Sequence, residues 1–171
     1  MASSPHRLLP TEVEERLRAR FGQDVLQFED SHGHAVAHVA PSRYRDIVSM
    51  LRDDPELAFD FMEFTGGVDY QDKGLEVVTH LWSSSLGHHV RLRVPLPVED
   101  PVCPTISDLY AGANWHERET TEMFGITFDG HPEPVKLLLA EEFDGHPLRK
   151  DFPLMSREAK PWPGGPDEDE E

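Results

Sequence analysis

Histidine offers the most chemistry in this sequence, because the chain contains ten histidines. Neutral imidazole is the commonest metal ligand in proteins, and it exchanges protons near neutral pH. His131 and His146 each precede a proline, and His88 and His89 are neighbours in an expected strand. Adjacent strand residues point to opposite faces, so His88 and His89 cannot readily share one ion, and no pair has the four-residue spacing on an expected helix. We therefore expect surface or hydrogen-bonded histidines, and no catalytic, cofactor-binding or metal-ligating residue in this chain.

A second chemical group consists of the charged residues Glu117, Arg118, Glu119 and Glu122 in an expected helix. Paired carboxylates in different environments are a common acid–base device. On a helix, however, Glu117 and Glu119 lie roughly 200° apart and cannot act on one substrate. Arg118 and Glu122 are four residues apart, which predicts an ion pair within the helix. We interpret the group as an ion-pair network that fixes the helix against its surroundings.

Sequence motifs for nucleotide and acyl chemistry are missing: the chain has no Gly-x-Gly-x-x-Gly turn, no P-loop and no Gly-x-Ser-x-Gly elbow. Gly66-Gly67 is interpreted as a turn. Cys103 is the only cysteine, so the chain alone cannot form an intrachain disulfide or hold an iron–sulfur cluster on thiolates. We expect Cys103 to be a free thiol in a loop.

The segment 145–153 contrasts with its surroundings, because it is basic and aromatic within a chain of net charge −17. A proline near each end stiffens its backbone, which lowers the entropy lost on docking. Arg149 offers a planar fork for carboxylates and Phe152 offers an aromatic anchor. These properties predict a docking segment.

The net charge of −17 argues against binding to nucleic acid or to an anionic membrane surface, since both need clustered lysine and arginine. No run reaches the roughly 18 apolar residues of a membrane span, and the first residues do not form a signal peptide. We expect a soluble, cytoplasmic protein that reaches a membrane only through partners.

Periodicity and stop signals predict an α+β fold: a mixed β-sheet with helices packed mainly on one face, followed by an extended C-terminal arm. The expected helices start at Thr11, with Glu14 completing a capping box, at Ser42, and near Thr105. The last is broken near Gly112 and ends at Gly125. Strands are expected at 25–28, 35–39, 57–64, 75–82 and 88–96. The expected segments are a flexible N-terminus (1–10), the α+β domain (11–130), a docking arm (131–160) and an acidic disordered tail (161–171).

A longer pattern joins these segments, and it comprises Trp115 to Glu119, Glu122 to Ile126, Phe128, Gly130 to Pro132 and Gly145 to Pro153. An ordered match over about forty residues exceeds the coincidence expected of a short motif. It resembles the signature region of the thirty-kilodalton, C-type subunit of proton-translocating NADH:quinone oxidoreductase, respiratory complex I. Weaker resemblance extends over residues 40–155. Glu122 stands where the family usually has Asp, Glu133-Pro134 where Leu usually follows an acidic or amide residue, and Lys136 where Arg is usual.

The resemblance implies a non-catalytic subunit of the peripheral arm, without flavin, quinone or iron–sulfur ligands of its own. Its implied partners are the D-type subunit, which forms the quinone site, and the B-type and I-type iron–sulfur proteins. NADH, flavin, clusters and quinone would belong to the assembled complex on the cytoplasmic side of the membrane. The implied subunit interface comprises Trp115, Glu117, Arg118, Glu119, His131, His146, Arg149, Lys150, Asp151 and Phe152.

Two other classes of function stay open at this point. The chain could serve a related assembly, such as a membrane-bound hydrogenase or a quinone oxidoreductase fed by another donor, because other subunits set the donor. It could also be a stand-alone hydrolase with a histidine metal site, which stoichiometric metal in the isolated protein would support.

Overall fold

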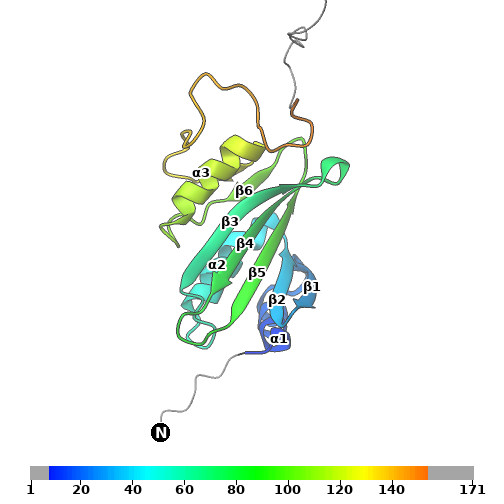
Figure 1. Ribbon diagram of the computed structural model, residues 1–171. Coiled ribbons are helices and arrows are strands. Elements are labelled where there is room, and N and C mark those ends of the chain that lie inside the picture. The colour runs from blue at the N-terminus through cyan, green and yellow to red at the C-terminus, as the bar shows by residue number, and fades with distance from the viewer. Residues whose placement is uncertain (1–7, 154–171) are drawn as a thin grey trace, which may run out of the picture.

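A five-stranded mixed sheet organises the chain, which the computed structural model describes for residues 8–153 (Figure 1). The strand order is β1-β2-β5-β4-β3, in which β2 and β5 run parallel and the other neighbours antiparallel. The expected α+β class with a mixed sheet is confirmed. The strands are β1 (Val25–Ser31), β2 (His34–Val39), β3 (Phe61–Asp69), β4 (Leu75–Trp82) and β5 (His89–Leu96).

One face of the sheet is covered by α1 (Pro10–Phe21) and α2 (Tyr44–Asp53), which lie behind the strands in Figure 1. Alternate residues of β5 are buried, as expected for a strand with one face on the core. Ile47 and Leu51 of α2 are fully buried in one core with the inward residues of the sheet. Burial of such a side chain contributes roughly 1.5–3 kcal/mol. The opposite face carries the polar and aromatic side chains of the strands.

The third helix, α3 (Ala113–Phe124), lies along the edge strand β3 (Figure 1). It is flanked by two short parallel strands, β6 (Val102–Pro104) and β7 (Thr127–Asp129). Gly125 ends α3 in the left-handed conformation at φ 75°, as the sequence predicts. Cys103 is buried in β6, so the expected loop position is wrong.

All three helix starts differ from the prediction, and α3 begins at Ala113 rather than near Thr105, because residues 107–109 form a turn. Helix α1 begins at Pro10, where the Glu12 carboxylate accepts a hydrogen bond from the backbone of Leu9 at 2.7 Å. Proline suits this position because its missing N–H would have no partner there. A short 3-10 turn (Pro41–Arg43) leads into α2, and no side chain caps that helix. Two further 3-10 turns are Gly22–Asp24 and Gln71–Lys73.

The third strand also begins four residues later than predicted, since β3 spans Phe61–Asp69. Gly66-Gly67, interpreted as a turn, lies inside this strand and pairs with β4. The reason is the approach of α3: a Cβ added at Gly67 would stand 2.5 Å from the Phe124 ring. Glycine at this position therefore reflects close packing of a helix on a strand.

Candidate interaction surface

The segment 131–153 runs back over α3 without regular secondary structure, and we call it the arm (Figure 1). Glu122 of α3 fixes its middle. The carboxylate accepts hydrogen bonds from three successive backbone amides, those of Leu137, Leu138 and Leu139, at 3.1, 2.9 and 2.9 Å. An ionised carboxylate makes stronger hydrogen bonds than a neutral acceptor, so this contact is a principal attachment of the arm.

Arg118 attaches the preceding residues of the arm. Its guanidinium donates to the backbone carbonyls of Val135 at 2.9 Å and Lys136 at 3.0 Å, and it lies 3.5 Å from the Glu133 carboxylate. The predicted ion pair between Arg118 and Glu122 is therefore wrong. Both side chains are committed to backbone groups that no helix or strand satisfies.

Lys136 organises the next turn of the arm. Its ammonium donates to the carbonyls of Ala140, Glu141 and Phe143 at 3.2, 3.0 and 2.7 Å. An ammonium has three donors that can converge on three carbonyls, whereas a guanidinium is a planar fork. Lysine at this position therefore makes three converging hydrogen bonds that the planar arginine fork is less suited to make.

The predicted docking segment 145–153 is attached at both ends. Near its start, His146 Nδ1 lies 2.9 Å from the carbonyl oxygen of Glu122. Near its end, the Phe152 ring stacks on that of Phe143, with centroids 6.0 Å apart. Between them, the backbone of Lys150 donates to Asp69 at the end of β3, at 2.7 Å. The segment is therefore a fixed part of the folded chain.

Arg149 does not present a free fork to solvent. It donates twice to the Asp151 carboxylate, at 3.0 Å each, and its side chain is 19% exposed against 68% for Asp151. The hydrogen-bonded arginine lowers the pKa of Asp151, and the aspartate raises the pKa of Arg149. The outward-facing charges of this turn are accordingly Lys150 and Asp151.

Glu117 lies inside the chain, with no exposed surface. Its carboxylate accepts hydrogen bonds from the backbone of Ile106 at 2.8 Å and from the Thr105 hydroxyl. Burial raises its pKa to about 7, although both hydrogen bonds oppose that rise. His131 Nε2 lies 3.8 Å from the same carboxylate and 3.2 Å from the carbonyl of Asn114. These two sequence-predicted residues are thus brought together, in the interior.

Several large apolar side chains of α3 and the arm are exposed. Trp115 is 65% exposed, Leu138 62% and Leu148 53%, and Glu119 is also exposed. Large exposed apolar side chains are candidates for contacts with a protein partner. Among the predicted interface residues, Trp115, Glu119, Lys150 and Asp151 therefore face solvent, whereas Glu117 does not.

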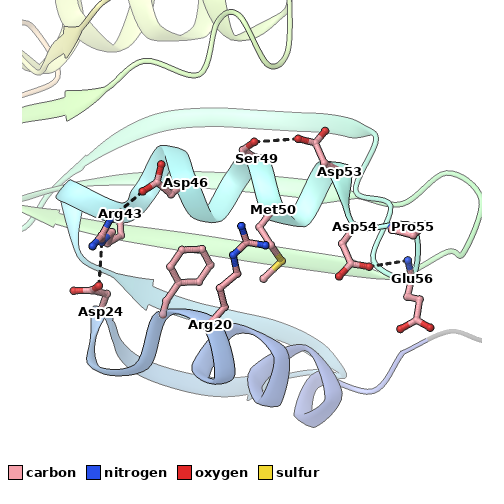
Figure 2. Close-up of a pocket in the computed structure, with 11 residues that line it drawn as sticks. Arg20, Asp24, Arg43, Asp46, Ser49, Met50, Asp53, Asp54, Pro55 and Glu56 are labelled. Atoms are coloured by element: carbon pink, nitrogen blue, oxygen red, sulfur yellow. Dashed lines mark hydrogen bonds and ion pairs between the residues drawn. The ribbon is translucent and has the colours of Figure 1, made fainter.

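A separate hollow of about 850 Å³ lies between α1 and α2 (Figure 2). Its charged side chains mostly bind one another: Arg43 pairs with Asp24 and Asp46 at 3.2 and 3.1 Å, and Ser49 donates to Asp53 at 3.0 Å. Because these groups are satisfied locally, they do not form a converging ligand site.

Sequence reasoning missed two features. The sequence assigns Glu122 to an ion pair with Arg118 and treats Lys136 only as a departure from a family pattern, because the actual partners of both are backbone groups that leave no mark in a sequence. A cluster of Glu63, His80 and His89 was also missed, because these residues lie on three different strands. The conclusion that His88 and His89 face apart is correct, since His88 is buried and His89 is part of this cluster.

The fold and this surface define a class: a small α+β domain whose C-terminal arm is fixed across its last helix. Residues 37–158 match the family described as "Respiratory-chain NADH dehydrogenase, 30 Kd subunit". The C subunit of NADH-quinone oxidoreductase from Roseiflexus castenholzii is 43% identical over 145 residues, covering 84% of this chain and 83% of that protein. The protein of the same name from Burkholderia multivorans is 40% identical, covering 81% and 74%. The chain therefore belongs to the family of the 30 kDa subunit of respiratory-chain NADH dehydrogenase.

Solved structures show the same fold. The trypsin-resistant fragment (1–134) of Nqo5 is 29% identical with a TM-score of 0.61, covering 72% of this chain and 97% of the fragment. A chain of the membrane-bound sulfane sulfur reductase, an archaeal respiratory membrane complex, is 22% identical with a TM-score of 0.72, covering 85% and 86%. At that identity the second likeness concerns the fold alone.

Proposed function

We propose that this chain is a peripheral-arm subunit of an NADH:quinone oxidoreductase of the complex I type, with no redox cofactor and no catalytic residue of its own. Its role is to connect the D-type subunit, which forms the quinone site, with the B-type and I-type iron–sulfur proteins. Flavin, clusters and quinone belong to those other subunits. Electron transfer from NADH to quinone, coupled to proton translocation, is then an activity of the assembly.

The observation that carries this proposal is the fixed arm together with exposed large apolar side chains on the arm and on α3. Glu122 and Arg118 attach the arm to α3, while Trp115, Leu138 and Leu148 remain exposed. A surface that is ordered before binding loses less entropy on association. Tryptophan and arginine are also among the residues most often found to dominate the energy of protein interfaces.

The turn of the arm that contains Arg149 exposes one positive and one negative charge, which suits a partner surface that carries charges of both signs. Lys150 and Asp151 face outward, while two N–H groups of Arg149 are bound to the Asp151 carboxylate. Exchange of one carboxylate for another is nearly balanced, whereas a stranded arginine in a closed interface costs roughly 2–5 kcal/mol. Arg149 therefore holds Asp151 in place on this turn.

The sequence supports a role without electron transfer through the chain itself. Cys103 is its only cysteine, and it is buried with a pKa raised by that burial, so it is unsuited to cluster ligation. None of the helices described here is long and apolar enough to cross a membrane. The proposed location, which rests on the family to which the chain belongs, is the cytoplasmic side of the membrane, through the partner subunits.

The test is purification of the tagged full chain from its native host after mild solubilisation. Wild type is expected to recover the quinone-site subunit and the two iron–sulfur proteins together with NADH:quinone activity. Trp115→Ala is expected to reduce both at least tenfold, because it removes an exposed aromatic contact. Leu26→Ala is the matched control, since Leu26 on β1 is also an exposed apolar side chain, at 54%.

Three outcomes would count against the proposal in different ways. Recovery of the cluster-bearing subunits without NADH-dependent activity would favour a related membrane complex with another donor. Recovery of the chain alone would refute the scaffold role. Equal recovery of partner subunits with Trp115→Ala and Leu26→Ala would show that the interface does not include Trp115 on α3.

A further inference from the structure

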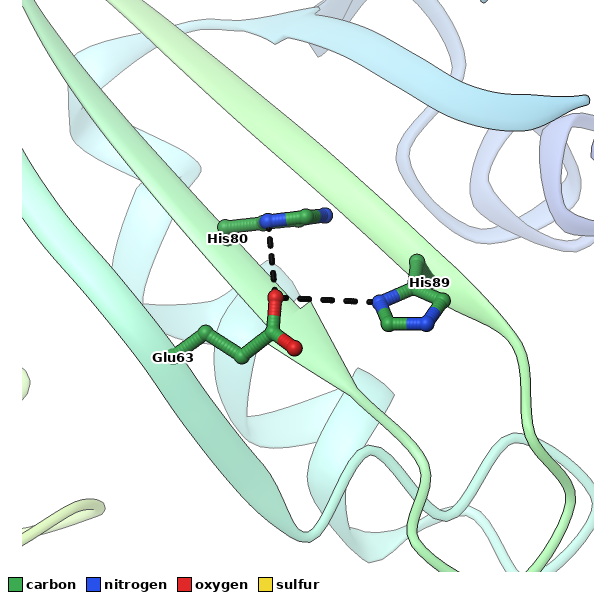
Figure 3. Close-up of side chains that lie close together, drawn as sticks. All are labelled: Glu63, His80 and His89. Carbon is green, nitrogen blue, oxygen red and sulfur yellow. Dashed lines mark ion pairs between the residues drawn. The ribbon is translucent and has the colours of Figure 1, made fainter. Parts of the chain in front are cut away.

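Three side chains that the scaffold role does not use converge on the open face of the sheet: Glu63 of β3, His80 of β4 and His89 of β5 (Figure 3). One carboxylate oxygen of Glu63 lies 2.8 Å from His80 Nδ1 and 3.7 Å from His89 Nδ1. One oxygen and two ring nitrogens thus lie within 4.8 Å of one another. The side chains are partly accessible, at 33%, 24% and 23% exposure.

The sheet itself produces this convergence. The pairing of β4 with β5 sets Trp82 opposite His89 and places His80 two residues away on the same face. The β3–β4 register shifts between Met62 and Phe64, so Glu63 is an extra residue at a bulge. Bulges redirect side chains and are common beside functional sites. Here the bulge allows the Glu63 carboxylate to reach the two imidazoles.

The donor atoms match a known coordination chemistry. Two imidazole nitrogens and one carboxylate oxygen form a ligand set that zinc uses with an open fourth position. Zinc lies about 2.0–2.2 Å from such atoms, which puts tetrahedral ligand atoms roughly 3.4 Å apart. The oxygen–nitrogen separations of 2.8 and 3.7 Å bracket that distance. Small side-chain rotations would therefore bring the three ligands to one ion.

His89 supplies a second, independent observation. Its Nδ1 atom is buried and makes no hydrogen bond to any residue from 8 to 153, and its ring stacks on Trp82 with centroids 6.0 Å apart. A buried nitrogen without a hydrogen bond costs free energy, so such an atom is normally satisfied by something. Figure 3 shows this nitrogen directed at the Glu63 carboxylate.

We propose that Glu63, His80 and His89 bind one divalent cation of the zinc class, with solvent water completing its coordination. Zinc has no redox chemistry, so the site is compatible with a subunit that carries no electrons. It lies six residues along β3 from Asp69, where the arm is attached, a distance of roughly 20 Å in a strand. The ion would cross-link three strands at the end of the sheet away from the arm.

The experiment uses the full chain with its purification tag removed and its metal stripped by a chelator. Zn²⁺ is titrated in competition with a chromophoric chelator, and the bound metal is counted after gel filtration. Wild type is expected to retain one Zn²⁺ per chain, and Glu63→Gln and His80→Gln to bind at least tenfold more weakly. His32→Asn is the control, because it removes an exposed histidine outside the cluster and Asn tolerates the positive φ of 57°.

Stoichiometric binding that all variants share would place the metal elsewhere and overturn the proposal, as would the absence of binding by wild type. Far-UV circular dichroism shows whether the variants are folded. Should a variant fail to fold, X-ray absorption of the wild-type zinc complex decides: two imidazoles with oxygen ligands support the site, and a thiolate or a single imidazole refutes it.

Discussion

Arg118 and Glu122 lie one turn apart on α3 and bind consecutive parts of one loop rather than each other. Arg118 donates hydrogen bonds to the carbonyls of residues 135 and 136, and Glu122 accepts hydrogen bonds from the amides of residues 137 to 139. Five successive residues of an irregular segment thereby have a backbone group satisfied by a helix side chain. Backbone groups without hydrogen-bond partners are energetically costly. The hydrogen bonds to Arg118 and Glu122 therefore favour a single conformation of the arm.

Replacement of Glu122 tests this attachment. In Glu122→Gln an amide group takes the place of one oxygen and meets backbone donors, while the charge-assisted hydrogen bonds are lost. We expect the free energy of unfolding to fall by about 2 kcal/mol in urea denaturation, and protease cleavage within 135–144 to become faster. Glu119→Gln, at an exposed position of the same helix, is expected to change neither. Unchanged protease protection in Glu122→Gln would contradict the attachment.

Lys136 tests whether the arm needs an ammonium at this point. Lys136→Met removes all three donors to the carbonyls of residues 140, 141 and 143, and it should speed cleavage of that turn severalfold. Lys136→Arg should give an intermediate rate, because a planar fork satisfies fewer of these carbonyls. Limited proteolysis with mass spectrometry measures both. A Lys136→Arg rate equal to that of Lys136→Met would show that charge alone has no effect there.

Gly67 tests the contact between α3 and β3. In Gly67→Ala the new Cβ would stand 2.5 Å from the Phe124 ring, so the helix must shift, at an expected cost of about 1–3 kcal/mol in thermal or urea unfolding. Gly112→Ala is the matched control, because its Cβ would meet only Met62 Cε, at 3.8 Å. That control should be neutral or slightly stabilising. Equal stability of the two variants would contradict close packing at Gly67.

These contacts show which parts of the structure a sequence can reveal. The bounds of β4 follow correctly from the sequence, because its alternating apolar residues report burial on one face directly. The sequence places β3 too early, because Gly66-Gly67 has the composition of a turn and the approach of α3 is a tertiary feature. For the same reason the sequence predicts the arm only as an extended segment, since its partners are side chains on α3. The tail beyond residue 153 lies outside the residues described.

Cys103 provides a further test of the core. Burial, with Glu117 nearby, raises the pKa of its thiol well above the ordinary value of 9.0, and only the thiolate reacts with disulfide reagents. We expect no measurable reaction with an aromatic disulfide reagent at about pH 8 in the folded chain. After denaturation one thiol per chain should react, because Cys103 is the single cysteine. Rapid reaction of the native protein would mean that the packing around Cys103 in β6 opens readily.

Glu117 should give the stability of the chain a measurable pH dependence. Its pKa is about 7 in the folded chain against an ordinary value of 4.5, because burial disfavours the charged form. Between these values the folded state binds more protons than the unfolded state, so the free energy of unfolding falls as pH rises from 4.5 to about 7. Below and above that window Glu117 contributes no slope. The full difference corresponds to roughly 3 kcal/mol.

The Glu117→Gln variant isolates this contribution, because all other titrating groups are common to both proteins and cancel in the difference. Glutamine keeps an oxygen that can accept from the Ile106 amide but carries no charge into the interior. Its stability relative to wild type should therefore rise with pH across the window and stay constant above about pH 8. Urea denaturation at several pH values measures the difference. A difference that does not change with pH would mean that the Glu117 carboxylate is ionised in the folded chain at little cost, and that its two hydrogen bonds offset burial.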